Sequence, residues 1–329
     1  MNLAILSKKL KNKNLILCFL LLIIILCLIF NPTKYISVCL NGILVFGLNL
    51  LPAMLPFIFF TKLLTSTGYV ESFSKIFSPI TQKLYNSPAI SSYVFLMSIL
   101  SGYPLGAKIT ADLFSEGLIT RQEAHRICSF TSNSGPMFIV GTVGVSMLNS
   151  PQIAYILLIS HIVSALLNGL IYKKFHCQEF FAEKKVAGKP DKSISACMEN
   201  SVLSVLMIGG YVAIFFVLTE ICTSLKLFEP ICSAFSIFGI QPGITKSVLN
   251  GVFEITNGCK NISALTCSNF LKASLSSFII SLGGLAVAFQ GLNFLEVFKV
   301  NKKFFFLQKF THGIISTLIT VLLCLIFKI

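Results

Sequence analysis

Residues 101–108 read SGYPLGAK, and they interrupt a chain that is otherwise strongly apolar. Gly102 and Gly106 allow backbones to approach closely, and Pro104 lacks a backbone donor, so a regular helix through this stretch is disfavoured. In a bilayer, a helix break leaves N–H and C=O groups that must be buried in protein or face a wet cavity. The stretch therefore predicts a broken helix beside a cavity or a tightly packed neighbour.

The composition shows what surrounds this break. The chain has 329 residues, of which 55% are hydrophobic and 12% charged, and its mean hydropathy is +0.85. Soluble domains contain about 25% charged residues. A chain with half that share lacks the polar side chains needed to cover a surface in water. We therefore expect an all-α integral membrane protein with the lipid bilayer as a partner.

The net charge of +14 comes largely from lysines that gather next to apolar runs. The groups are Lys8, Lys9, Lys11 and Lys13; Lys173, Lys174, Lys184, Lys185, Lys189 and Lys192; and Lys299, Lys302, Lys303 and Lys309. Cytoplasmic loops carry such an excess of basic residues near the ends of membrane spans. The pattern predicts a multi-pass cell-membrane protein whose N-terminus and 175–195 loop are cytoplasmic, and it argues against nucleic acid as a partner.

The apolar segments are many, and several are short or broken. They are 15–30, 36–64, 89–107, 135–149, 151–172, 201–225, 244–258, 270–290 and 306–327. A plain spanning helix needs about 20 residues. We expect about eight transmembrane segments, with one or two re-entrant half-helices among them.

One stretch between these segments is amphipathic. In residues 70–85, Phe73, Ile76, Phe77 and Ile80 follow the i, i+3, i+4, i+7 spacing of one helix face. Such a helix lies along the membrane interface or packs as a surface helix on the bundle. The spacing alone does not separate these two interpretations.

The two halves of the chain resemble each other in three blocks that keep their order. PFIFFTKLL (56–64) matches VAIFFVLTEI (212–221), LSGYPLGA (100–107) matches LNGVFEITNG (249–258), and FTSNSGPMFIVG (130–141) matches FIISLGGLAVAF (278–289). We infer a basic segment with a first span (1–35), one repeat (36–174), a polar basic loop (175–195), and a second repeat with a C-terminal span (196–329).

Duplicated membrane units with matched breaks are typical of transporters, which bind a solute between the broken helices. The breaks therefore nominate the substrate-binding residues. In the first half these are Ser101, Gly102, Tyr103, Pro104, Gly106, Lys108, Asn133, Ser134, Gly135 and Pro136. In the second half they are Glu254, Asn257, Gly258, Gly283, Gly284 and Gln290. The alternatives are a tight hairpin at 101–108 and an ordinary helix cap at 132–136.

Glu254 is the strongest single candidate, because a carboxylate in an apolar segment is costly and marks function by default. Lys108, Lys246 and Lys260 are its candidate partners, and an architectural ion pair is the alternative role. For Glu220 and His161 we favour a structural role.

The helix at 120–130 opens with TRQE, in which Thr is followed three residues later by Glu. This is the capping-box pattern of a helix start. The predicted helix leads directly into the second break, TSNSGP.

Enzyme chemistry has little support in the sequence. The chain contains no HExxH, GxSxG or P-loop motif. The eleven cysteines are scattered without a CxxC pair, which is typical of cysteines used as small buried hydrophobes. We expect no catalytic residues, no metal and no cofactor.

The combination of SGYPLGAK, NSGP and FEITNG resembles the YlbJ-type sporulation integral membrane proteins, which belong to the nucleoside-recognition or Gate-domain superfamily. The resemblance runs over roughly residues 36–325, so the two repeats are Gate-like. It implies a polytopic protein of endospore-forming bacteria that serves spore envelope or cortex assembly. It also implies that Gly102, Tyr103, Pro104, Asn133, Ser134, Gly135 and Glu254 line a pore or site.

These expectations combine into a transporter-like or channel-like protein with a small-solute site between two repeats. The alternative is a membrane scaffold of the sporulation machinery that moves nothing, and a weaker one is an enzyme acting on a lipid-linked precursor. The partners expected besides lipid are a small molecule or ion, further copies of the chain, or other sporulation membrane proteins.

Overall fold

The computed structural model describes residues 3–67, 76, 78–174 and 193–329, and every element in this part of the chain is a helix. The predicted all-α membrane class is thereby confirmed. Five helical stretches are long and apolar enough to cross a membrane: Pro32–Leu64, Pro151–Tyr172, Ile194–Ser224, Asn269–Phe298 and Lys302–Phe327. Three shorter apolar helices accompany them, Leu15–Phe30, Ser91–Ser101 and Phe138–Met147. How many of these cross the bilayer completely stays a prediction.

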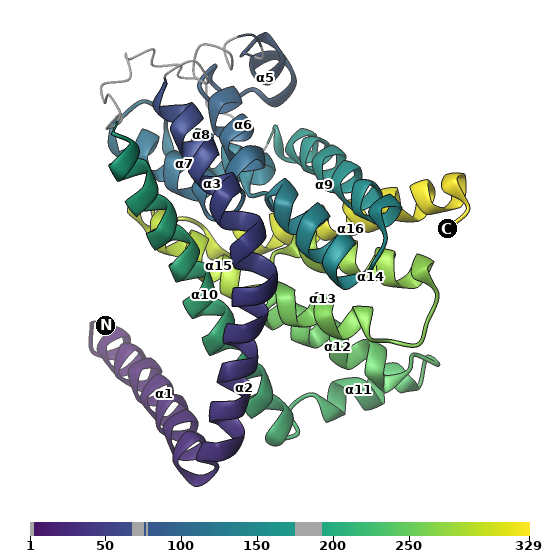
Figure 1. The fold of residues 1–329 in the computed structure, drawn as a ribbon. Helices are drawn as coiled ribbons and strands as arrows, with labels where there is room; N and C mark the ends of the chain where they lie inside the picture. The colour runs from purple at the N-terminus through teal and green to yellow at the C-terminus, as the bar shows by residue number, and fades with distance from the viewer. Residues whose placement is uncertain (1–2, 68–75, 77, 175–192) are drawn as a thin grey trace.

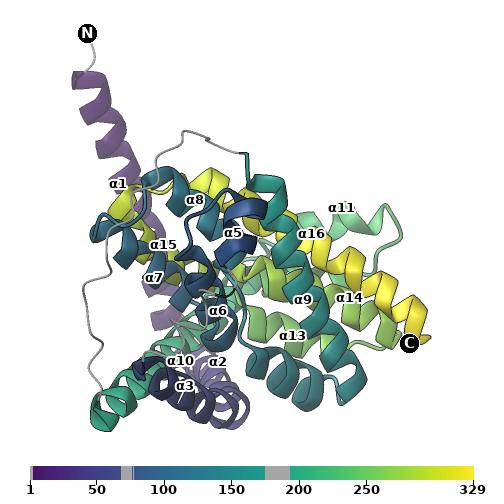
Figure 2. The same ribbon diagram turned by 90° about the horizontal axis from the view of Figure 1, so that it is seen from above.

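A pair of long helices forms one side of the molecule. α2 (Pro32–Val45), the π-helical turn η1 (Phe46–Leu50) and α3 (Leu51–Ser66) run on as one column, and α10 (Ile194–Ser224) packs along them (Figure 1). Proline cannot donate the intrahelical hydrogen bond, and the wider π turn ends just before Pro52. Seen from above, α2, α3 and α10 lie together at one side, while α1 (Leu3–Phe30) extends away from the body (Figure 2).

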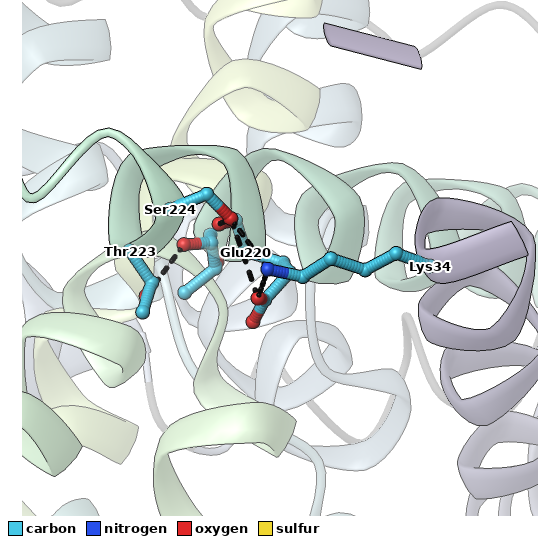
Figure 3. A network of polar contacts seen from close by, with 5 residues as sticks. Lys34, Glu220, Thr223 and Ser224 are labelled. Atoms are coloured by element: carbon cyan, nitrogen blue, oxygen red, sulfur yellow. Dashed lines mark hydrogen bonds and ion pairs between the residues drawn. The ribbon is translucent and has the colours of Figure 1, made fainter. Parts of the chain in front are cut away.

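A polar clip joins the start of α2 to the end of α10 (Figure 3). Lys34 Nζ lies 2.7 Å from Glu220 Oε1 and donates to Ser224 Oγ at 2.8 Å. Glu220 thus has the structural role predicted for it. The lysine side chain is 46% exposed and the glutamate 29%, and exposed ion pairs contribute about 0–1 kcal/mol, so the apolar contacts of the two helices supply most of the attraction.

The remaining helices occur in one order, twice. The first series is α6 (Ser91–Ser101), α7 (Leu105–Ser115), α8 (Arg121–Thr131), η3 (Phe138–Met147) and α9 (Pro151–Tyr172). The second is α12 (Pro242–Phe253), α13 (Ile255–Ser263), α14 (Asn269–Leu282), α15 (Gly284–Leu295) and α16 (Lys302–Phe327). The short helices α5 (Ser78–Tyr85) and α11 (Glu229–Ser236) precede the two series, and the 3₁₀ turn η4 (Glu296–Phe298) follows α15.

The contacts between the two series are reciprocal: corresponding helices of each series make the same contact with the other, as expected for a duplicated unit. α7 of the first series packs on α15 of the second, and α13 of the second packs on η3 of the first. The last helices of the two series, α9 and α16, pack on each other. These contacts bring the four helix breaks of the two series close together. Each series is called a repeat below, and the predicted division of the chain into repeats stays a prediction.

The amphipathic stretch 70–85 falls mostly outside the described residues. Only its end is seen, where α5 begins at Ser78, and Ile76 before it is exposed. The two interpretations of this stretch therefore stay open. The loop 175–195 likewise lies outside the described residues, except for its last three positions.

The predicted breaks are present, and close backbone contact explains their glycines. Gly102 has φ +72°, and a Cβ there would lie 2.5 Å from the Gly135 backbone nitrogen. In the second repeat, Gly284 has φ +63°, and a Cβ there would lie 2.9 Å from the Gly251 carbonyl oxygen. In each repeat, the backbones of its two helix breaks are in close contact. Glycine allows this contact because it has no side chain.

We predict that Gly102→Ala lowers the free energy of unfolding by about 2 kcal/mol or more, because backbone cannot move aside as a flexible side chain does. The matched control is Gly210→Ala, since Gly210 lies in α10 with open space around it. The unfolding midpoints of both variants are measured by heating the protein in detergent. A thiol-reactive dye follows the unfolding, because it reacts with the buried Cys128, Cys259 and Cys324 once they become exposed. Equal midpoints for the two variants would contradict the close-contact argument.

Candidate functional site

A cavity of about 50 Å³, the central cavity, lies where the breaks of the two repeats meet. Its polar lining comes from Tyr103, Ser134, Glu254, Thr256 and Gln290, with Tyr211 of α10 beside them. Its other lining residues are Leu50, Met54, Gly135, Phe138, Ile208, Val212, Ile255, Ala286 and Val287. Five of the sequence-predicted site residues thus border one space: Tyr103, Ser134, Gly135, Glu254 and Gln290.

A second, smaller cavity of about 10 Å³, the hairpin cavity, lies between the two breaks of the first repeat. It is bordered by the predicted residues Gly102, Tyr103, Pro104, Gly106 and Asn133. Asn133 is 2% exposed; its amide nitrogen donates to Ser98 Oγ and to the Phe130 carbonyl, both at 2.9 Å. Its amide oxygen is buried without a hydrogen-bond partner. A water molecule needs about 10–15 Å³, so this space holds at most one.

Two further buried oxygens occupy matching positions in the repeats. Ser101 precedes Gly102 and Asn250 precedes Gly251, and neither Ser101 Oγ nor Asn250 Oδ1 has a hydrogen-bond partner. Buried polar atoms are nearly always paired. Ser101 and Asn250 border neither cavity, so these oxygens are a feature that the two breaks share and not part of the cavity lining.

Glu254 caps a helix, and the predicted lysine partners are wrong. It is 3% exposed, stands at the break between α12 and α13, and its Oε2 accepts from the backbone N–H of Asn257 at 2.7 Å. Within the described part of the chain, Lys108, Lys246 and Lys260 form no ion pair with it. The positive end of a helix stabilises a carboxylate in the first turn, so Glu254 needs no lysine. Lys108 is exposed on α7.

The other predicted residues border neither cavity. They are Ser101, Lys108, Pro136, Asn257, Gly258, Gly283 and Gly284. The glycines allow close packing, since a Cβ at Gly258 would lie 2.2 Å from the Gly251 Cα. Thr120 and Glu123 form the predicted capping box at the start of α8.

His161 connects the breaks of the two repeats. Its Nε2 accepts from the backbone N–H of Ser134 at 2.9 Å, and its Nδ1 lies 2.8 Å from Ser281 Oγ, next to the second-repeat break. Its ring stands 4.8 Å, centroid to centroid, from that of His312. His161 lies ten residues after the start of α9 and His312 ten after the start of α16. Both ring nitrogens of His161 have partners, in line with the predicted structural role, but its place at the repeat interface was not foreseen.

Lys309 is the residue that sequence reasoning misplaced. We expected a loop charge before the last span, whereas Lys309 lies inside α16 and is 3% exposed. Its Nζ donates to the Ser132 carbonyl at 2.7 Å and to Tyr103 Oη at 2.8 Å, and lies 4.2 Å from the centre of the Tyr103 ring. The missed signal was a polar stripe within an apolar helix: Lys309, His312, Ser316 and Thr320 share one helix face and are all buried.

Comparison with known proteins agrees with the sequence motifs. Residues 47–160 match the family described as Gate: Nucleoside recognition. The curated "Sporulation integral membrane protein YlbJ" of Bacillus subtilis (strain 168) is 26% identical over 342 residues, covering 95% of this chain and 83% of the relative. The predicted resemblance to the YlbJ-type proteins is confirmed. The Gate match runs from η1 to α9 and includes both first-repeat breaks. No solved structure matches the chain.

We predict that His161→Phe destabilises the protein by about 1–3 kcal/mol, because the buried N–H of Ser134 and hydroxyl of Ser281 lose their partner. Tyr155→Phe, on the exposed side of α9, is the control and should leave stability within about 0.5 kcal/mol. Thermal midpoints in detergent measure both. A midpoint for His161→Phe equal to that of the control would contradict the bridging role.

Proposed function

We propose that this chain is a transporter-like membrane protein of endospore formation that binds a small solute at the central cavity. The observation that carries the proposal is the convergence of broken helices from both repeats on one cavity, in whose largely apolar lining six polar side chains stand. Transporters with internal repeats hold their substrates in this way near the midplane of the bilayer. The similarity to YlbJ, named as a sporulation integral membrane protein, supports the cellular process.

The size of the cavity limits which solutes can bind there. About 50 Å³ has room for a few water-sized groups, whereas drug-sized ligands occupy about 300–1,000 Å³. A nucleoside, the ligand class in the Gate family's description, would therefore bind only after the breaks move apart. A small polar solute fits the present shape better, with Tyr103, Ser134 and Gln290 as its hydrogen-bonding groups. The proposed activity is binding and movement of this solute, without enzymatic chemistry. We also propose that the N-terminus and the 175–195 loop face the cytoplasm.

A scaffold that moves nothing is the second candidate. The observation in its favour is that the breaks are closely packed and their backbone groups largely bonded within the protein, as at Ser134 and Glu254. A scaffold would tolerate substitution of the polar residues of the central and hairpin cavities as long as the fold persists, so the two candidates predict different outcomes for the same variants.

We predict that Glu254→Gln and Asn133→Ala, at normal abundance, lower the yield of heat-resistant spores by about tenfold or more, the loss expected when a buried polar site group is removed. The assay is complementation of a Bacillus subtilis strain that lacks YlbJ. Glu229→Gln and Asn293→Ala, at exposed positions of α11 and α15, are the matched controls. Full spore yield with both site variants would support the scaffold.

Binding is tested directly by thermal-shift screening of the purified protein against nucleosides, small anions and small polar metabolites. A solute that raises the midpoint of the unaltered chain, but not of the Glu254→Gln variant, would locate it at the central cavity. Equal shifts in both proteins would assign binding elsewhere.

A further inference from the structure

Lys309 is buried at the interface between the repeats, and solute binding alone does not explain a basic side chain there. Placing a charge in an apolar environment is costly unless it is paired. Among the described residues, the ion pairs found are Lys34–Glu220 and Lys302–Glu296, and neither involves Lys309. The partners that the described residues offer this charge are two neutral acceptors and a tyrosine ring.

The two acceptors are parts of the first-repeat breaks. Ser132 follows the last residue of α8, where the helix presents the negative end of its dipole and its unbonded carbonyls. Tyr103 lies in the break between α6 and α7 and also borders the central cavity. The ammonium thus holds both breaks of the first repeat to α16, a helix of the second.

The second-repeat break closes the remaining side. A Cβ built on Gly283 would lie 3.3 Å from Tyr103 Oη and 3.5 Å from Lys309 Nζ. One ammonium therefore stands where breaks of both repeats meet, a position in which its charge bears on how the repeats are joined. Loss of its proton would remove the charge, its burial cost and the charge-assisted hydrogen bonds, which are roughly twice as strong as neutral ones.

We propose that Lys309 is the proton-binding site that couples the two repeats, so that the proton is the coupling ion of the solute cycle. The inference rests on the proposed transport function. When Lys309 is protonated, it fixes Tyr103 and Ser132 to α16. It releases one proton to water through the Tyr103 hydroxyl, which turns from the Ile280 carbonyl, its acceptor at 3.4 Å, and gives its own proton to the water while it takes the ammonium proton. The amine left behind is neutral, and it holds the two breaks to α16 more weakly because its N–H groups now form only neutral hydrogen bonds.

The other titratable groups that face Lys309 are few. They are Tyr103 at the α6–α7 break, Cys128 on α8, His161 on α9 and His312 on α16 itself. None of them is a carboxylate. Since no anion there compensates for the charge, its gain or loss must change the interactions that hold the breaks.

The test is hydrogen–deuterium exchange of the full chain in lipid nanodiscs at about pH 6 and about pH 9, corrected for the intrinsic chemical rate. In the unaltered protein, peptides covering 100–106 and 130–138 should exchange on the order of tenfold faster at the higher pH, while peptides of α10 should not change. Lys309→Arg, which stays charged throughout, should remove this response. Lys302→Met, at an exposed position of the same helix, should retain it.

The response must depend on Lys309 itself. No pH response in the unaltered chain, or a response that persists in Lys309→Arg, would overturn the proposal. Lys309→Met should exchange fast at both pH values, and Lys309→Arg decides the matter where the methionine variant does not fold. A rate of solute uptake that does not change with pH would refute proton coupling, but it would not contradict the proposed transport. A Lys309-dependent exchange response without uptake of any screened solute would refute transport and leave the proton site standing.

Discussion

Unpaired backbone groups in a bilayer are the constraint on which this structure depends. Each helix break frees N–H and C=O groups that lipid cannot satisfy, so each break requires a partner within the protein. The chain has such breaks in both repeats, and they satisfy one another and their neighbours: Ser134 donates to His161, Ser132 accepts from Lys309, and Glu254 accepts from its own helix start. Packing the repeats face to face is what allows these partners to be found.

The same packing creates the candidate site. Once the breaks face each other, their lining residues border a common space that regular helices would fill with apolar side chains. Tyr103, Ser134, Glu254, Thr256 and Gln290 supply the polar groups of this space, and Ser134 and Glu254 are also bonded to the breaks themselves. Structural need and solute binding therefore draw on the same residues.

Much of the fold follows from patterns in the sequence alone. Low charge and long apolar runs predict the membrane class, the Gly and Pro residues of SGYPLGAK and NSGP predict the first-repeat breaks, and TRQE predicts the start of α8. These signals are local: they depend on the conformations that a few neighbouring residues allow. The resemblance to the YlbJ-type proteins likewise rested on short motifs. Contacts between side chains far apart in the sequence were harder to predict, as the wrong lysine partners for Glu254 show.

What the sequence determined by itself is where helices exist, where they break and which medium surrounds them. Only the tertiary structure decided that Lys309, which the sequence groups with the lysines before the last span, points inward to hold two breaks, and that His161 and His312 meet between the repeats. The physical reason is that helix propensity and hydropathy are properties of neighbouring residues. The partner of a buried charge, by contrast, is set by the packing of helices that lie far apart in the chain, since Lys309 and Tyr103 are separated by 206 positions.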